Sequence, residues 1–166
     1  MKKKLSVSAI AVLLMIILMR VQGSSLKTST SPRAIVDLEF ADTPQRLQDL
    51  ILHWDLSVVK MNIWLDFLFI VTYVLFLSIT AEFSAIKWGE GIGQKIGFWM
   101  ARIAYVAGVL DIAENLLMLQ SVTGNFTGSS LRLTFYCAAV KFILAGLVLL
   151  YILISLPVSL RKNKDG

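Results

Sequence analysis

Three long apolar stretches place the strongest limit on what this chain can fold into. They cover residues 61–81, 96–119 and 133–156 of a chain of 166 residues. A helix needs roughly 20 apolar residues to cross about 30 Å of hydrocarbon, and each stretch meets that length. The sequence therefore predicts a bundle of membrane-spanning helices, with Pro157 ending the last of them.

The composition agrees with a membrane protein and excludes several other classes. Hydrophobic residues make up 57% of the chain and charged residues 16%, which is more apolar than a typical soluble domain. Nucleic-acid binding is excluded because the basic residues behind the net charge of +5 are spread along the chain and form no aromatic-interleaved stripe. Cys137 and His53 are the only residues of their types, so we expect no internal disulfide, no metal site and no cofactor.

The N-terminal segment, residues 1–22, allows two interpretations. Three lysines precede the apolar run 5–19, and Arg20 ends that run. This pattern is typical of a signal peptide cleaved after Gly23, or of an uncleaved signal anchor, which Arg20 favours by its closeness to the cleavage point. The predicted fold is thus an all-α integral membrane bundle of four transmembrane helices, or of three if residues 1–23 are removed.

The distribution of basic residues predicts the orientation of the bundle. Lysine and arginine dominate residues 1–4, 85–95 and the tail from Arg161, whereas segment 20–60 is balanced in charge and segment 120–131 has no charged residue. The positive-inside rule then places both termini in the cytoplasm of a multi-pass cell-membrane protein. The short lysine-rich start and compact loops favour a bacterial inner membrane.

The outer segment between the first two predicted spans contains a helix of its own. Residues 23–33 are rich in Ser and Thr and predict a linker. Thr43 and Pro44 are typical of a helix start, and the apolar residues that follow at helical spacing are Leu47, Leu50, Ile51, Trp54 and Val58. They predict an amphipathic helix at about 43–58. It lies at the outer membrane interface with Trp54 at headgroup level, or it caps the mouth of the bundle.

Five charged residues lie within the spans. Arg102 is placed towards the cytoplasmic side, and four others in the outer half need an explanation: Asp66, Asp111, Glu114 and Lys141. Inserting a charged side chain at mid-bilayer costs about 2.5–3.5 kcal/mol. Such residues are therefore found where they are paired, hydrated or needed for function. From the helical rise, Lys141 and Asp111 lie roughly 15 and 14 Å from the outer end, and Glu114 and Asp66 roughly 8–9 Å. We therefore expect Lys141 to pair with Asp111.

The helix faces bring further polar residues towards these charges. Asp111, Glu114 and Asn115 follow the spacing i, i+3, i+4 and share one stripe. The polar residues on one side of the first long stretch are Asn62, Asp66 and Tyr73. We expect the faces to meet in the outer half of the bundle. The candidate ligand or ion cluster comprises Asp66, Asp111, Glu114, Asn115, Lys141, Asn62 and Tyr136.

The charge balance of this cluster is its most informative property. Three acids face one lysine, so at least one carboxylate is expected to hold a proton, bind a cation, or meet water or a partner. The leading hypothesis is a non-enzymatic membrane protein that binds a hydrophobic or amphiphilic ligand, or another membrane subunit, at this cluster. The alternatives are an ion- or proton-coupled carrier or relay acting as an oligomer, and a purely structural accessory subunit. Catalysis is disfavoured because the spans contain no histidine and no recognisable nucleophile motif.

Overall fold

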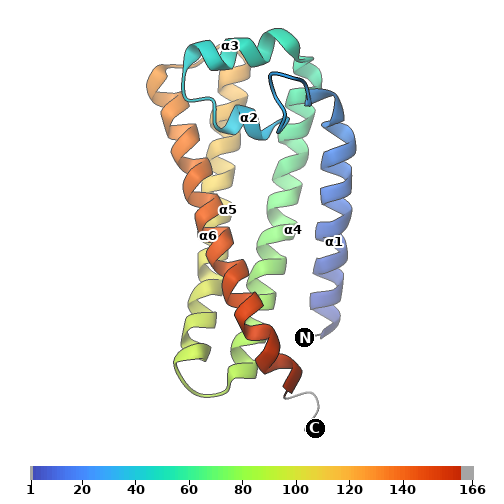
Figure 1. Cartoon of the computed structure of the whole chain (residues 1–166), viewed down its shortest axis with the longest axis vertical. Helices are drawn as coiled ribbons and strands as arrows, with labels where there is room; N and C mark the ends of the chain where they lie inside the picture. The colour runs from blue at the N-terminus through green and yellow to red at the C-terminus, as the bar shows by residue number, and fades with distance from the viewer. Residues whose placement is uncertain (1, 162–166) are drawn as a thin grey trace.

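The chain folds into four long helices and a small helical segment that covers one end of them. The computed structural model describes residues 2–161. The elements are α1 (Lys2–Gln22), η1 (Ser24–Leu26), α2 (Val36–Glu39), α3 (Pro44–His53), α4 (Leu56–Trp88), α5 (Ile92–Val122) and α6 (Gly128–Arg161). Among the described residues, α1, α4, α5 and α6 are long and apolar enough to cross a membrane (Figure 1). The predicted all-α bundle of four helices is therefore confirmed.

The long helices extend beyond the predicted spans. α4 begins at Leu56, directly after Asp55, whose side chain accepts a hydrogen bond of 2.8 Å from the Ser57 amide and caps the helix. At its other end, Gly89 and Gly91 adopt φ values of 72° and 147° and turn the chain tightly into α5. α6 continues past Pro157, so the prediction that this proline ends the helix is wrong. The fixed φ of proline is compatible with a helix, which can continue at the loss of one backbone hydrogen bond.

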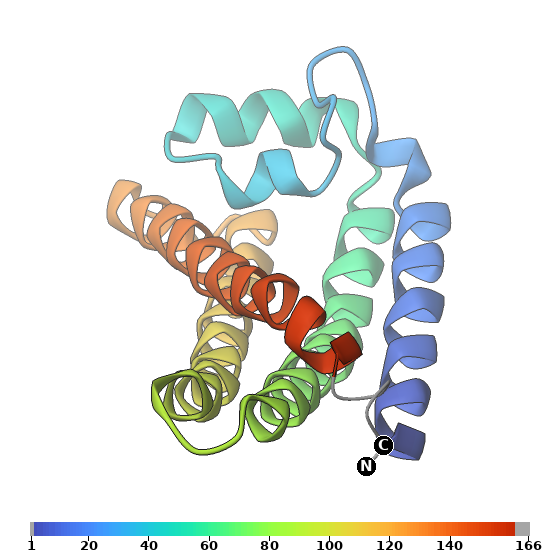
Figure 2. The ribbon, with the colours of Figure 1, turned by 60° about the horizontal axis from the view of Figure 1, so that its bottom comes forward.

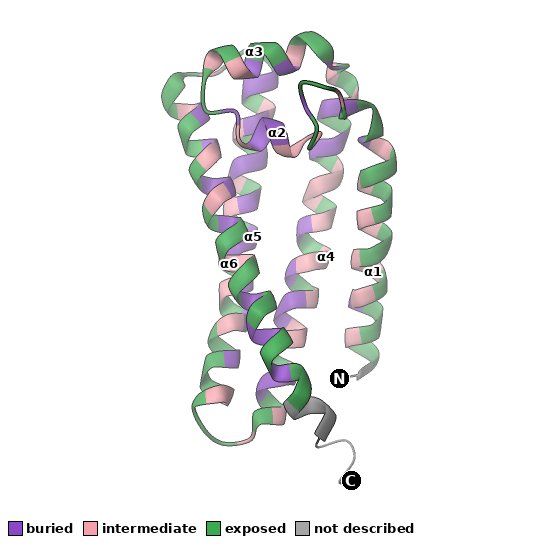
Figure 3. Cartoon of the chain, viewed as in Figure 1, coloured by how far each residue is buried: buried purple, intermediate pink, exposed green. Residues whose placement is uncertain are grey.

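The long helices are arranged so that α4, α5 and α6 share an interior. α1 lies along α4 at the edge of the bundle, and α6 runs obliquely from beside α5 towards α4 (Figures 1 and 2). Buried residues follow the inward faces of α4, α5 and α6, whereas α1 is largely exposed (Figure 3). We refer to the end of the bundle that carries α2 and α3 as the lid end, and to residues 23–55 as the lid.

The first part of the lid, predicted as a linker at 23–33, is mostly exposed and irregular, but buried residues within it anchor it to the rest of the protein. Leu26 is only 1% exposed, and Ser31 is fully buried. The Ser31 hydroxyl donates to the Leu26 carbonyl at 2.8 Å, and the Ser31 amide donates to Thr28 Oγ1 at 3.1 Å. Short hydroxyl side chains bond to nearby backbone in this way and can fix a turn without a helix or strand.

The second part of the lid contains the predicted amphipathic helix, in shorter form. Thr43 caps α3 by accepting a hydrogen bond from the Arg46 amide, and Pro44 is its first residue, as predicted. α3 ends at His53 rather than near 58, because Trp54 and Asp55 adopt extended backbone and the next residues start α4. Trp54 is 7% exposed and its Nε1 donates to the Leu26 carbonyl at 2.8 Å. Of the two predicted roles, capping the bundle fits this burial.

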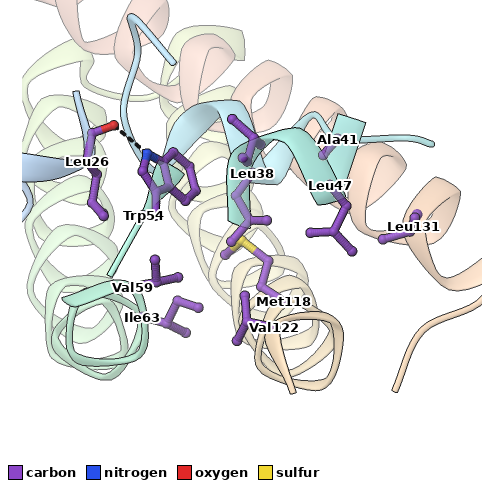
Figure 4. Close-up of a cluster of buried hydrophobic side chains, with 11 residues drawn as sticks. Leu26, Leu38, Ala41, Leu47, Trp54, Val59, Ile63, Met118, Val122 and Leu131 are labelled. Carbon is purple, nitrogen blue, oxygen red and sulfur yellow. Dashed lines mark hydrogen bonds between the residues drawn. The ribbon is translucent and has the colours of Figure 1, made fainter. Parts of the chain in front are cut away.

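Two apolar clusters stabilise the bundle, one under the lid and one deeper. The first consists of Leu26, Leu38, Ala41, Leu47, Leu50, Trp54, Val59, Ile63, Met118, Val122 and Leu131 (Figure 4). The second consists of Leu77, Ala81, Ala101, Ala104, Val148, Tyr151 and Ile152. The charged residues Asp66 on α4, Asp111 and Glu114 on α5, and Lys141 on α6 lie between these two sets in the sequence of their helices. The charges therefore occupy a polar layer between two apolar layers.

Candidate functional site

Lys141 is the centre of the polar layer. It lies near the middle of α6, and its Nζ is 2.6 Å from Asp111 Oδ1 on α5. The same Nζ lies 3.0 and 2.9 Å from the two carboxylate oxygens of Glu114, one helical turn further along α5. The expected contact between Lys141 and Asp111 is therefore present, and Glu114 joins it because residues i and i+3 of a helix share one face.

α4 holds the opposite side of these acids through two hydrogen bonds. The Tyr73 hydroxyl donates to Asp111 Oδ2 at 2.8 Å, so both oxygens of Asp111 are engaged. The Asn115 amide donates to Asp66 Oδ2 at 2.7 Å. Asn115 and Glu114 are fully buried, whereas Asp66 and Tyr73 are only partly buried. The α4 side is thus the more accessible side of the site.

A fourth acid, Glu39, reaches the site from the lid. Its Oε2 lies 3.5 Å from Lys141 Nζ, and its side chain is about one-tenth exposed. Burial raises the pKa of Glu39 to about 7, and the charges of Asp111 and Asp66 act in the same direction, while Lys141 opposes them. We call Glu39, Asp66, Tyr73, Asp111, Glu114, Asn115 and Lys141 the polar cluster.

The neighbours of Glu39 on α2 explain why it reaches so far inward. Leu38 is buried in the apolar cluster under the lid, which anchors the helix from one side. Phe40 stacks on Phe142 of α6 with ring centres 6.0 Å apart, just beyond Lys141 in the sequence. Asp37 accepts hydrogen bonds from the Arg33 backbone and side chain at 2.8–3.1 Å, which fixes the turn before α2. These contacts set the glutamate between two anchored neighbours.

Two residues of the predicted cluster lie elsewhere. Tyr136 is 63% exposed and its ring packs edge-on against Phe135. It precedes Lys141 by five residues, which places the two side chains on different faces of α6. Asn62 is buried, but its amide donates to Gln22 Oε1 at 2.6 Å, because α1 lies along that side of α4. The structure therefore does not bring Tyr136 or Asn62 to Lys141.

The sequence reasoning missed Glu39 altogether and named Tyr73 without assigning it to the site. Tyr73 carried a usable signal, because it lies seven residues after Asp66 on the same helical face. Glu39 carried a weaker one: with Asp37 it interrupts the apolar stretch 34–41 of the outer segment. Nothing in the local sequence pattern indicates that Glu39, rather than Asp37, points inward to a lysine of a transmembrane helix.

The charge balance of the polar cluster is more negative than the sequence indicated. Glu39, Asp66, Asp111 and Glu114 supply four carboxylates, and Lys141 supplies one ammonium group. No set of three or more His, Cys, Asp or Glu residues among those described is arranged to hold a metal ion. In addition, the buried Asn115 Oδ1 has no hydrogen-bond partner among the described residues. The arrangement can therefore accept a proton or an organic cation, and it offers an unused acceptor beside Asp66.

Comparison with known proteins gives no relative for this arrangement: no family model, curated protein or solved structure matches the chain.

Proposed function

We propose that this chain is a non-enzymatic membrane protein that binds the cationic group of an amphiphilic ligand at the polar cluster, with Asp66 as the contact. The observation that carries the proposal is the excess of carboxylates over cations in the polar layer. Buried negative charge is costly unless a positive charge compensates it. An amphiphile delivers such a charge from the bilayer without bringing water with it.

Asp66 is the acid best placed for this role. Lys141 forms ion pairs with Glu39, Asp111 and Glu114, and none with Asp66 is found in the described part of the chain. Asp66 is held by the neutral amide of Asn115 and is partly exposed. It therefore keeps unused charge at the accessible side of the site. The nearby aromatic pair Phe69 and Tyr73, with ring centres 5.4 Å apart, adds ring surface that suits an alkylammonium group.

The same proposal includes an orientation. Basic residues Lys3, Lys4, Lys87 and Lys95 lie at the end of the bundle opposite the lid, which supports a cytoplasmic location for that end. The lid then faces the outside of the cell, or the periplasm of a bacterial inner membrane. The ligand would enter from the outer half of the bilayer.

A proton relay receives less support from the same residues. A relay needs ionisable groups in series across the membrane. In the described chain, the buried carboxylates and lysine of the transmembrane helices stop at Asp111 on the side away from the lid. Beyond it, the buried residues of these helices that carry hydroxyl groups are Ser78, Ser84, Ser155 and Ser8, together with Tyr151, whose hydroxyl donates to the Gly93 carbonyl at 3.1 Å. No buried carboxylate or lysine among the described residues continues the series.

The test compares a charged and a neutral amphiphile of equal chain length. Dodecylamine is cationic at neutral pH, and dodecanol is not. We expect dodecylamine to bind the purified protein in nanodiscs, and Asp66→Asn to weaken binding about tenfold or more, as for loss of a charged hydrogen bond. Glu82→Gln, which removes an exposed acid of the same helix, is the matched control and should leave the affinity unchanged.

Two results would count against the proposal. Equal binding of dodecanol and dodecylamine would show that the charge of the ligand plays no part. Unchanged affinity for dodecylamine in Asp66→Asn would show that Asp66 does not contact the cationic group. If the amine fails to bind but Asp66→Asn dissociates an oligomer, the cation that meets Asp66 belongs to a basic residue of a partner helix instead.

A further inference from the structure

A second site lies at the lid end of α1, away from the polar cluster. It is a groove of about 680 Å³, bounded by the last turn of α1, the lid residues around 23–36 and Asn62 of α4. This volume falls in the range of small-molecule sites in proteins. The apolar residues that line it are Met19, Pro32, Ala34, Ile35 and Val36. It therefore offers an apolar wall at the level where a transmembrane helix leaves the bilayer.

The charged residues of the groove all have the same sign. Arg20, Lys27 and Arg33 line it, and no Asp or Glu does. Arg33 is neutralised by Asp37 at 2.9 Å. The side chains of Arg20 and Lys27, by contrast, have no hydrogen-bond or ion-pair partner in the part of the chain that the structure describes. Two uncompensated cations thus stand beside an apolar wall.

The inner wall of the groove adds an unused acceptor. Asn62 is 2% exposed, and its Nδ2 is engaged by Gln22, whereas its Oδ1 has no hydrogen-bond partner among the described residues. A ligand that satisfies the whole groove needs an anionic group for the two cations, a hydrogen-bond donor for Asn62, and an apolar body.

We infer that this groove binds an anionic phospholipid of the lid-side leaflet, with the phosphate between Arg20 and Lys27 and a headgroup hydroxyl directed to Asn62. Phosphatidylglycerol has this combination of groups. Basic residues near a membrane surface attract anionic lipid by about 1 kcal/mol each, and the apolar wall receives the start of an acyl chain. The site does not depend on the ligand proposed for Asp66, because the two share no residue.

The experiment measures lipid retention by native mass spectrometry after extraction from nanodiscs containing phosphatidylglycerol and phosphatidylcholine in equal amounts. We expect the wild-type chain to retain phosphatidylglycerol selectively. The double variant Arg20→Gln/Lys27→Gln should retain it about thirtyfold more weakly, which corresponds to two surface charges. The control Lys60→Gln/Arg132→Gln removes two exposed cations from the same end outside the groove, and it should retain lipid as the wild type does.

A second variant tests the groove independently, in case the first variant loses lipid because it misfolds. Val36→Asp places an acid in the groove wall and leaves both cations intact, so it should also lose phosphatidylglycerol. Displacement of the lipid by millimolar inorganic phosphate would show that the groove recognises free phosphate and would overturn the lipid assignment. Equal retention of the two lipids, or equal loss in the control variant, would overturn the site.

Discussion

Glu39 Oε2 of the lid lies 3.5 Å from Lys141 Nζ of α6. A carboxylate from outside the transmembrane helices therefore contacts a lysine near the middle of a transmembrane helix. The lid therefore places an ionisable side chain in the polar layer, in addition to its contacts with the apolar cluster beneath it. Because both partners are buried, this contact is sensitive to anything that changes the ionisation of Glu39 or the acids around it.

The first prediction concerns the pH dependence of lid closure. Burial raises the pKa of Glu39 from 4.5 to about 7 in the closed lid. Between these values the closed state keeps a proton that an open state has released, so closure weakens as pH rises from about 4.5 to 7 and is constant above that. The change amounts to about 3 kcal/mol. Hydrogen exchange of residues 24–41 at several pH values measures it.

Other charged groups face Glu39, so a variant is needed to isolate its share of the pH dependence. Lys141 faces it from α6, Asp111 from α5 and Asp66 from α4. Glu39→Gln should flatten the dependence between pH 5 and 7, whereas Glu90→Gln, an exposed acid at the other end, should not. An unchanged slope in Glu39→Gln would show that Glu39 is not the group responsible for the pH dependence.

The second prediction concerns Lys141. Lys141→Met leaves Asp111 and Glu114 buried without their cation, and we expect a loss of about 3–5 kcal/mol in unfolding free energy. The triple variant Lys141→Met/Asp111→Asn/Glu114→Gln removes the uncompensated charge and should recover most of it. Thermal unfolding in detergent is the measurement, with Lys95→Met as an exposed control. A single variant as stable as the wild type would show that the acids are already protonated.

The third prediction separates two tyrosines. Tyr73→Phe removes the hydroxyl that donates to Asp111 at 2.8 Å, and it should cost roughly 1.5–3 kcal/mol as a hydrogen bond to a charged group. Tyr136→Phe changes an exposed ring and should be neutral. Chemical unfolding of both variants in one detergent is sufficient. Equal effects would contradict the placement of these two side chains.

The fourth prediction concerns the attachment of the lid. Trp54 Nε1 donates to the Leu26 carbonyl and to Ser31 Oγ at 2.8 and 3.1 Å. Trp54→Phe keeps an aromatic ring but loses the donor, and it should destabilise the segment 24–31 by about 1–3 kcal/mol. Hydrogen exchange should accelerate there and not in α5. Trp64→Phe, at an exposed position of α4, is the control, and equal acceleration in both would rule out a specific role for the donor.

The four long helices and the central ion pair were predictable from the sequence because both depend on simple regularities. Span length follows from bilayer thickness, and the depth of Lys141 matches that of Asp111 when residues are counted from the same end. The stripe of Asp111, Glu114 and Asn115 follows from helical periodicity. None of these regularities depends on how the helices pack.

The lid was not predictable in the same way, because it is stabilised by contacts between distant segments. The Ser- and Thr-rich stretch 23–33 has the composition of a flexible linker, and the tertiary contact with Trp54 adds to the local hydrogen bonds that hold Leu26 and Ser31. Glu39 likewise depends on where α2 docks. Tyr136 was predicted wrongly because its helical phase relative to Lys141 was not considered.

The position of Lys141 in the last helix has a consequence for biosynthesis. Asp66, Asp111 and Glu114 leave the ribosome before their cation exists, since α4 and α5 precede α6 in the chain. Nascent chains that enter the bilayer without α6 must keep these acids protonated or near water. A chain truncated after residue 127 should therefore be poorly retained in the membrane and rapidly degraded, because insertion of the final helix supplies the lysine that pairs with Asp111 and Glu114.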